Sequence, residues 1–350
     1  MKKVASEEME RNRPMRVVVT GAAGFIGSHV AEILAAGNHE VLAIDDLSGG
    51  FEENVPARCR FEHRGVETPL DSLFESFRPE AVYHLAAYAA EGLSHHIPVF
   101  NYRNNVLATA NVLAAAFRCG TRHFTFTSSI AAYGPSEGSE PFSEDSACRP
   151  CDPYGIAKLA CEQQILSTHR YYGRPDYTIF RPHNVFGPRQ NVSDPYRNVV
   201  AIFMRCAREG KPMPIFGGGT QTRSFSYIDA VARSIAAAPM TAGARNRIIN
   251  VGGDEPMSVR DLARTVADVM GVPFEVDWLP ARKEVAHAHC RHDLSRSLFP
   301  EAYAGHVGIA EGLQRMADFV RSRPIPPPTE CPAPIEIPDG LPPSWAERLR

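Results

Sequence analysis

The sequence predicts an α/β protein with a doubly wound parallel sheet and a smaller C-terminal α/β domain. Three observations lead to this fold class. Short runs rich in β-branched and aromatic residues alternate with longer amphipathic stretches, a glycine-spaced turn follows the first run, and 350 residues are enough for two domains. Because strands that alternate with helices form right-handed βαβ units, the sheet is expected to be parallel and covered by helices on both faces.

The first half of the chain supplies the elements of this sheet. Apolar runs that end at glycine or polar residues predict strands, and apolar residues spaced three and four apart predict helices. Strands are expected at residues 15–21, 39–45, 81–87, 122–129 and 177–182, and helices at 25–37, 69–77, 101–118 and 154–172.

Beyond about residue 190 the alternation becomes less regular, which indicates a second structural unit. Helices are expected at 199–210, at 258–271 with Ser258 as the N-cap, and at 308–322, and strands at 212–219 and 273–280. Residues 323–350 contain nine prolines, which disfavour both helix and central strand. This tail is therefore expected to be an extended strap that can lie over a neighbouring surface, or a disordered extension.

Composition and charge exclude several classes of partner. A net charge of −3 provides no polycation for nucleic acid and no basic patch for a membrane surface. No apolar run approaches the ~18 residues of a membrane helix, and the N-terminus has no apolar core of a secretory signal. Eight scattered cysteines are typical of reduced thiols, so a cytoplasmic protein is expected. CRPC (148–151) has C-x2-C spacing but no second pair at the distance of a zinc ribbon, and in HAHCRHD alternation would place His287 and His289 on one strand face and Cys290 on the other, so no metal is expected.

A glycine-rich turn joins the first expected strand to the first expected helix. In TGAAGFIG, Gly21, Gly24 and Gly27 let the backbone turn tightly and approach a pyrophosphate, which then lies at the helix N-terminus. Asp45 ends the second expected strand, where a carboxylate accepts hydrogen bonds from ribose hydroxyls and repels a 2′-phosphate. The turn therefore predicts a site for NAD rather than NADP. The alternative role for Asp45 is that of a cap or turn residue in DDLSGG.

Tyr154 and Lys158 are spaced to share one face of a helix. Side chains four residues apart lie about 5–6 Å from each other at Cβ. A nearby ammonium favours the phenolate, so Lys158 is expected to lower the pKa of Tyr154 from its usual ~10 and make it able to exchange protons. The alternative is an exposed helix face, since this spacing is common by chance.

Six motifs occur in order between residues 15 and 320: TGAAGFIG, HLAA (84–87), TSSIAAYG (127–134), YGIAK (154–158), RPHNVFGPRQ (181–190) and RSFSYID (223–229). Together they resemble the extended short-chain dehydrogenase/reductase family, above all its nucleotide-sugar 4-epimerases of the UDP-glucose 4-epimerase kind. The resemblance implies a Rossmann domain for NAD, mainly residues 15–190, and a substrate domain, mainly residues 191–320, with some strands returning to the Rossmann sheet. Residues 1–14 are then a leader, and residues 321–350 are the proline-rich tail.

The resemblance also implies a set of site residues. The catalytic residues would be Ser129, Tyr154 and Lys158, with Ser129 preferred to Ser128 because of its offset from Tyr133. The expected NAD contacts are Gly21, Gly24, Phe25, Ile26, Gly27, Asp45, Asp46, Ser48, Leu85, Ala86, Ala87, Tyr154 and Lys158. The expected contacts of the nucleotide sugar, most closely a UDP-sugar, are Ser94, Ser129, His183, Asn184, Val199, Arg223, Arg282 and Glu284.

Several of these side chains could instead have purely structural roles, and some positions depart from the family pattern. His183 can equally be a packed core histidine, and each arginine can form a surface salt bridge. Gly65 stands where relatives carry an aspartate that meets adenine, and Tyr88 where several epimerases carry a lysine near the cofactor phosphate. The loop AEGLSHH (90–96) is a variant of a sugar-facing segment, so the sugar can differ from glucose and galactose.

The implied reaction is epimerisation at C4 through a transient 4-ketosugar, with NAD regenerated in each turnover. A nucleotide-sugar dehydratase is one alternative, but it needs an acid–base pair after the catalytic serine, where this chain has Ile130 and Ala131. The others are a net NAD(P)-dependent reductase or dehydrogenase, and a redox-sensing scaffold without turnover. The resemblance further implies a homodimer that pairs the helices at about 101–118 and 154–171.

Overall fold

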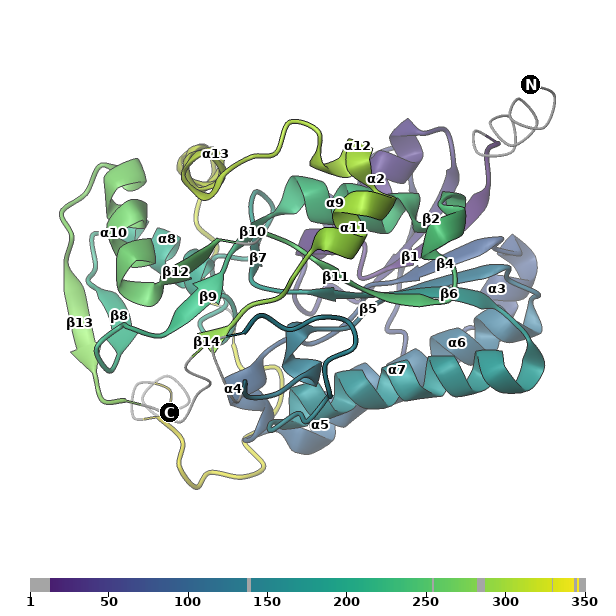
Figure 1. Cartoon of the computed structure of the whole chain (residues 1–350), viewed down its shortest axis with the longest axis horizontal. Coiled ribbons are helices and arrows are strands. Elements are labelled where there is room, and N and C mark those ends of the chain that lie inside the picture. Colours follow the sequence, from purple (N-terminus) through teal and green to yellow (C-terminus); the bar gives the residue numbers. More distant parts are fainter. Residues whose placement is uncertain are drawn as a thin grey trace.

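The computed structural model describes residues 13–136, 140–253, 255–281, 287–328, 330–342 and 345. The predicted leader therefore lies outside the described residues, except for Arg13 and Pro14. Within the described part, seven parallel strands form one sheet in the order β11–β6–β5–β4–β1–β2–β3, with helices on both sides (Figure 1). This is the Rossmann-like architecture that the alternating pattern predicts.

The elements of this layer follow the predicted order. The strands are β1 (Arg16–Thr20), β2 (Glu40–Asp45), β3 (Arg60–His63), β4 (Ala81–His84), β5 (His123–Thr127), β6 (Asp176–Pro182) and β11 (Arg247–Val251). The helices are α2 (Phe25–Ala36), α3 (Asp71–Phe77), α4 (Glu91–Ser94), α5 (Pro98–Tyr102), the π-helical η2 (Arg103–Leu107), α6 (Ala108–Arg118), α7 (Pro153–Tyr172), α9 (Ile228–Ala237), α11 (Asp293–Leu298) and α12 (Pro300–Tyr303). Single 3₁₀ turns lie at η1 (Glu52–Asn54), η3 (Ile130–Ala132), η4 (Ala238–Met240) and η5 (Ala242–Ala244).

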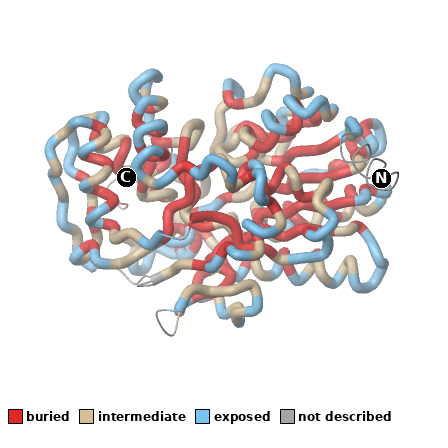
Figure 2. Tube along the Cα trace, turned by 45° about the horizontal axis from the view of Figure 1, so that its top comes forward, coloured by how far each residue is buried: buried red, intermediate tan, exposed pale blue. Residues whose placement is uncertain are grey.

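Strand β1 illustrates why the sheet is buried on both faces. Val17 and Val19 belong to a core cluster shared with α2 and α9, whereas Val18 belongs to a second cluster shared with α3, α6 and α7. Because successive side chains of a strand point to opposite faces, an unbroken apolar run fits only a sheet covered on both sides. Figure 2 shows this burial in the central strands, with exposed positions toward the periphery.

A smaller C-terminal lobe lies beside the carboxyl ends of the strands. It consists of α8 (Val199–Glu209), β8 (Met213–Phe216), β9 (Thr222–Ser224), β12 (Pro256–Ser258), α10 (Val259–Met270), β13 (Val276–Leu279), β14 (His287–Ala288) and α13 (Ile309–Arg321). The short strands pair as β13–β8 and β12–β9–β14, and β7 (Val185–Phe186) pairs with β10 (Ser226–Tyr227) where the two parts meet. In the sequence β11 lies between elements of this lobe, but in space it pairs with β6 at the edge of the large sheet.

The expected helix at 101–118 and the expected strand at 81–87 differ in detail from the structure. The helix begins at Pro98 and contains the π-helical turn η2, where Asn105 Nδ2 donates to the Asn101 carbonyl at 3.0 Å. Strand β4 stops at His84, where the Leu85 amide is shared between the carbonyl and the hydroxyl of Thr20 and the Ala86 amide donates to the hydroxyl, all at 3.2 Å. In both places a side chain forms hydrogen bonds with the backbone at the point where the regular helix or strand is interrupted.

The described part of the proline-rich tail is extended. The described residues between 323 and 342 form no helix or strand, in agreement with the eight prolines of that segment. Cys331, Ala333, Ile335 and Leu341 pack against a small cluster that includes Trp345 and residues that follow β4. The strap is therefore the correct one of the two expectations for these residues.

Candidate active site

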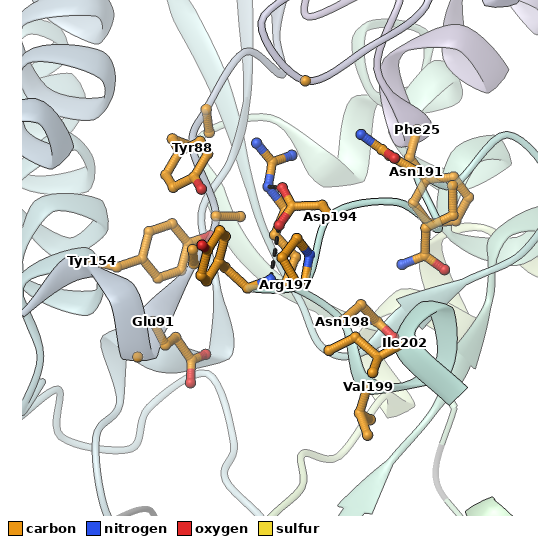
Figure 3. Close-up of a pocket in the computed structure, with 18 of the residues that line it drawn as sticks. Phe25, Tyr88, Glu91, Tyr154, Asn191, Asp194, Arg197, Asn198, Val199 and Ile202 are labelled. Atoms are coloured by element: carbon orange, nitrogen blue, oxygen red, sulfur yellow. Dashed lines mark hydrogen bonds and ion pairs between the residues drawn. The ribbon is translucent and has the colours of Figure 1, made fainter. Parts of the chain in front are cut away.

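A cavity of about 1530 Å³ lies at the carboxyl ends of the strands, between the sheet and the C-terminal lobe. One wall comes from the segments that follow β1, β2, β4 and β5, and the other from α8, β8 and β9. Figure 3 shows Tyr88 and Tyr154 on one side of this space, and Phe25 and Val199 of α8 on the other. Ligands of doubly wound proteins bind at this edge of the sheet.

The glycine-rich turn forms the floor of the cavity at the start of α2. Gly21 has a φ of 70°, and a Cβ there would lie 2.7 Å from the amide nitrogen of Ala86. A Cβ on Gly27 would lie 1.9 Å from the carbonyl oxygen of Gly21. Larger residues are therefore excluded at both positions, and the N-terminal end of α2 faces the cavity without a side-chain cap. These residues fit a dinucleotide diphosphate at the helix start.

Asp45 lies at the end of β2 and lines the cavity next to this turn. Its carboxylate accepts hydrogen bonds from the amides of Ala23, at 3.0 Å, and Leu47, at 2.8 Å. Burial raises the pKa of Asp45, and the two amides oppose that rise. The turn role and the ribose role are compatible, since each carboxylate oxygen has a second lone pair for a ribose hydroxyl.

Tyr154 opens α7 and is buried at the cavity wall, with 6% of its surface exposed. Burial raises the pKa of Tyr154, the carboxylate of Glu91 adds to the rise, and a hydrogen bond with Ser129 lowers it. Lys158 Nζ lies 5.8 Å from the centre of the Tyr154 ring and donates to the Thr127 carbonyl at 2.8 Å. The pKa of Tyr154 was predicted to fall because of Lys158, but in the protein without cofactor it is raised. Burial is the dominant cause, and the Lys158 ammonium donates its hydrogen bond to the backbone instead.

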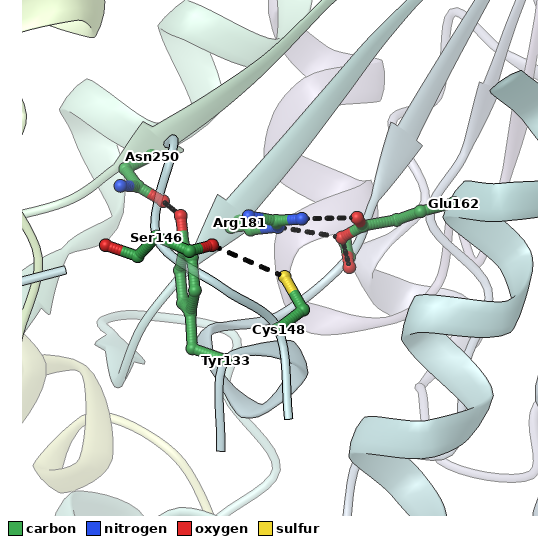
Figure 4. A network of polar contacts seen from close by, with 7 residues as sticks. Tyr133, Ser146, Cys148, Glu162, Arg181 and Asn250 are labelled. Carbon is green, nitrogen blue, oxygen red and sulfur yellow. Dashed lines mark hydrogen bonds and ion pairs between the residues drawn. The ribbon is translucent and has the colours of Figure 1, made fainter. Parts of the chain in front are cut away.

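The neighbouring serine, Ser128, has a different role. Its hydroxyl donates to the carboxylate of Glu162, which also forms a bidentate pair with Arg181 at 2.9 and 2.5 Å (Figure 4). The Arg181 guanidinium lies 4.5 Å from the centre of the Tyr133 ring, and the Tyr133 hydroxyl donates to Asn250 at 2.8 Å. This buried network fixes the end of β5, and Ser129 is the serine that reaches Tyr154.

A second buried chain of hydrogen bonds holds the other cavity-lining strand ends. His84 Nδ1 lies 2.8 Å from Thr20 Oγ1, and His84 Nε2 lies 3.0 Å from Thr109 Oγ1. Burial, together with the charge of Lys158, lowers the pKa of His84 to about 3. The imidazole is therefore neutral at pH 7.

All thirteen residues predicted to contact NAD line the cavity: Gly21, Gly24, Phe25, Ile26, Gly27, Asp45, Asp46, Ser48, Leu85, Ala86, Ala87, Tyr154 and Lys158. Because the glycines leave the room that a diphosphate needs and Asp45 lies where a ribose would, these residues fit the cofactor.

The residues predicted for the sugar nucleotide divide into three groups. Ser129, Asn184, Val199 and Arg223 line the cavity. Arg282 and Glu284 lie outside the described residues. The remaining two, Ser94 and His183, are absent from the lining that the structure describes, and both are 2% exposed.

These two buried residues have structural contacts instead. Ser94 Oγ donates to the Glu91 carbonyl at 2.6 Å and accepts from the Tyr154 amide at 3.2 Å, so Ser94 positions the start of α7. The ring of His183 stacks on His292 with 4.8 Å between centres, and Nε2 donates to the Gly253 carbonyl at 3.2 Å. The packed-core alternative for His183 therefore describes its position.

Sequence reasoning missed three charged residues around Tyr154, namely Glu91, Asp194 and Arg197 (Figure 3). Arg197 Nε lies 2.8 Å from a carboxylate oxygen of the buried Asp194, and its guanidinium lies 4.4 Å from the centre of the Tyr88 ring. Both Arg197 and Glu91 act on the pKa of Tyr154, in opposite directions. The available signal was NVSDPYRN (191–198), a charged turn between a recognised motif and the next helix.

A metal site and a membrane-spanning helix were searched for among the described residues. There, no three His, Cys, Asp or Glu side chains come together as a metal site, and no helix is long and apolar enough to cross a bilayer.

Comparison with known proteins fits this geometry. Residues 17–252 match the model of the NAD dependent epimerase/dehydratase family. The chain belongs to this family. It is 34% identical to the UDP-glucose 4-epimerase of Mycolicibacterium smegmatis, over 88% of this chain and 99% of the relative.

Solved structures of family members have the same fold. The UDP-glucose 4-epimerase of Thermotoga maritima, solved with UDP-glucose, is 31% identical with a TM-score of 0.82 over 88% of this chain and 99% of that one. The Thermus thermophilus enzyme, solved with NAD, is 32% identical with a TM-score of 0.81 and the same coverage.

Proposed function

We propose that this protein is an NAD-dependent nucleotide-sugar 4-epimerase that acts through a transient 4-ketosugar. The observation that carries the proposal is that Ser129, Tyr154 and Lys158 line the same wall of the cavity, with Ser129 near enough to Tyr154 to lower its pKa and Lys158 Nζ 5.8 Å from the centre of its ring. The proposal has support from two sources outside the site, since the chain is an enzyme of the epimerase/dehydratase family and has relatives named as 4-epimerases.

NAD, when bound, supplies a reversible hydride acceptor. Tyr154 takes the proton of the sugar 4-hydroxyl and later returns it, and Ser129 holds the same oxygen by a hydrogen bond. The raised pKa of Tyr154 keeps it protonated in the protein alone, so it is ready to donate; it accepts a proton only when a cationic group lowers that pKa. Lys158, whose ammonium donates to the Thr127 carbonyl at 2.8 Å, is proposed to hold the nicotinamide ribose.

Support for the epimerase over the dehydratase comes from the residues after Ser129. Elimination of water across C5 and C6 needs an additional acid–base pair, and Ile130 and Ala131 offer neither group. Support against a non-catalytic scaffold comes from the presence of both Tyr154 and Lys158.

The substrate is proposed to be a UDP-sugar, with Asn184, Val199 and Arg223 on the nucleotide side of the cavity. Arg223 lies on β9, where a guanidinium can bind phosphate oxygens in a fork. Arg282 and Glu284 are proposed to meet the diphosphate and the ribose. Residues 15–190 and 191–320 remain the predicted limits of the cofactor and substrate domains.

A cytoplasmic homodimer completes the proposal. All eight cysteines are free thiols, which supports a reducing compartment. Val99, Leu107 and Ile156 are 71%, 47% and 43% exposed on the helices proposed to pair, and such exposed apolar side chains support an interface there. Light scattering at micromolar concentration is expected to give a dimer mass, and monomer alone would contradict it.

Isotope transfer tests the reaction. The substrate is a UDP-sugar deuterated at C4, and NMR follows the label. An epimerase is expected to keep deuterium at C4 of the product with no added NAD consumed. A dehydrogenase would change the amount of reduced cofactor in proportion to product, and a dehydratase would exchange the C5 proton with solvent; either result would overturn the proposal.

A further inference from the structure

The proline-rich tail crosses the mouth of the cavity from one side to the other. After α13, the Pro326 carbonyl accepts a hydrogen bond from Ser193 Oγ at 2.8 Å, in the segment that leads into α8. Ten residues later, the amides of Glu336 and Ile337 donate to the His96 carbonyl at 2.8 and 3.1 Å, and His96 Nδ1 donates to the Ile337 carbonyl at 2.8 Å. His96 follows α4, so the tail is fixed on both sides of the cleft.

Glu336 attaches the tail to the helix that begins at Pro98. Its two carboxylate oxygens accept hydrogen bonds from the amides of Val99, at 2.7 Å, and Phe100, at 3.1 Å. These amides have no partner within the first turn of a helix, and a carboxylate satisfies both of them with charge-assisted bonds. The contact defines where the tail lies along the cavity.

Trp345 is the apolar anchor of the tail. It is 8% exposed and meets the ring of Tyr196 edge-on, with 5.3 Å between centres, and the ring of His96 at 6.4 Å. Gly92 gives it room, because a Cβ at that position would lie 3.1 Å from Trp345 Cη2. Trp345, Tyr196 and Tyr88 belong to one apolar cluster that is separate from the main core.

The anchor lies at the end of the cavity where Tyr154 is located. Gly92 follows Glu91, whose carboxylate acts on the pKa of Tyr154, and Ser94 in the same short helix binds the Tyr154 amide. Trp345 and several other tail residues line the cavity: Pro328, Asp339, Gly340, Leu341 and Pro342. The tail is thus a wall of the part of the cavity in which the reacting carbon would lie.

We propose that the tail, anchored by Trp345 and Glu336, is the outer wall of the hexose subsite, where it selects the sugar and retains the ketosugar. This inference rests on the proposed epimerase function. Aromatic rings are good surfaces for the apolar face of a pyranose. In the proposed reaction, oxidation at C4 would pass the hydrogen on C4 as hydride to bound NAD and the proton of the 4-hydroxyl to Tyr154. A ketosugar that leaves at that point takes away the acceptor for both and leaves the cofactor reduced.

Steady-state kinetics of variants at Trp345 and Glu336 test whether the tail retains the ketosugar. In Trp345→Ala and Glu336→Ala we expect KM for the UDP-sugar to rise about tenfold, since burial of a large aromatic side chain is lost or loosened. We also expect reduced cofactor to accumulate during turnover, seen by its absorbance. The matched control is Trp278→Ala, the other tryptophan of the chain, which is 49% exposed on β13 and is expected to behave as wild type.

Binding tests the wall without any turnover. In Trp278→Phe, Trp345 is the sole tryptophan, and its quenching by acrylamide reports access to the wall. The probe is whichever of UDP-glucose, UDP-glucuronic acid and UDP-N-acetylglucosamine binds most tightly by calorimetry, compared with UDP alone. We expect the sugar nucleotide to protect Trp345 more than UDP does, because only the sugar reaches this end.

The outcomes distinguish failure of the proposed role of the tail from failure of the proposed epimerase function. Protection by the sugar in a protein that epimerises none of the three would refute the proposed function and leave the wall supported. Equal protection by UDP and the sugar nucleotide, or Trp345→Ala with unchanged KM, unchanged sugar preference and no reduced cofactor, would overturn the wall even in an active epimerase.

Discussion

Replacement of Glu162 by leucine is expected to be among the most destabilising single changes at this site. The side chains of Arg181 and Glu162 are 3% and 0% exposed, so the variant leaves an arginine charge in the interior without its partner. It also removes two Arg181 hydrogen bonds and the one from Ser128. Loss of one partner of a buried pair costs about 3–5 kcal/mol, most of it from the unpaired charge.

The double variant Glu162→Leu/Arg181→Met isolates the cause. If the unpaired charge dominates, removal of both groups is expected to recover most of the lost free energy of unfolding. Urea unfolding followed by circular dichroism measures all three proteins at the same pH. Glu209→Leu is the matched control, since its side chain is 23% exposed and its pairs with Arg205 and Lys211 are partly solvated and worth about 1 kcal/mol or less. A loss below about 1 kcal/mol in Glu162→Leu, or a double variant no more stable than the single one, would refute this reasoning.

Three further changes test the proposed roles of site residues. Tyr154→Phe is expected to lower turnover by about 10²–10⁴-fold while calorimetry still detects NAD binding, and a rate within about threefold of wild type would remove Tyr154 from the mechanism. Asp45→Ser is expected to weaken the preference for NAD over NADP, and equal wild-type affinities for the two cofactors would contradict the assignment. Burial lowers the pKa of Lys158 from 10.5 to about 8, so between those values the unfolded chain binds more protons and this group makes the free energy of unfolding rise with pH. Lys158→Met is expected to remove that contribution, seen as a wild-type-minus-variant difference in urea unfolding that grows from pH 8 to pH 10.5; a constant difference would contradict it.

The sequence predicted the sheet because local periodicity encodes it. The order of strands and helices follows from runs such as the one at Val17–Val19, and the predicted N-cap is confirmed, since Ser258 Oγ accepts from the Asp261 amide at 3.0 Å. The points where strands end could not be predicted in the same way. The end of β4, for example, depends on Thr20, a residue distant in the sequence.

The site was predictable only where a motif carries its own geometry. The glycine turn and the Tyr154–Lys158 spacing are local, and both reach the cavity. His183 lies beside Asn184 in the same motif, yet a single step along the chain turns it from the cavity into the interior. Arg197 and Trp345 come from segments outside the motifs, and only tertiary structure shows that they meet the same space.

The chain of hydroxyls around His84 has a fixed direction. Thr109 Oγ1 donates to the Asn105 carbonyl at 2.7 Å, so it can only accept from His84 Nε2, and the neutral ring must then accept at Nδ1 from Thr20. Thr20 Oγ1 in turn accepts from the amide of Ala86. The donor of every hydrogen bond in this chain is thus determined, and His84 can adopt only the tautomer protonated at Nε2. All the side-chain hydrogen bonds therefore point in one direction, from the cofactor side of the sheet toward α6. A replacement at position 84 can preserve it only with a donor toward the helix and an acceptor toward the strand, a demand that an amide side chain can meet and an apolar one cannot.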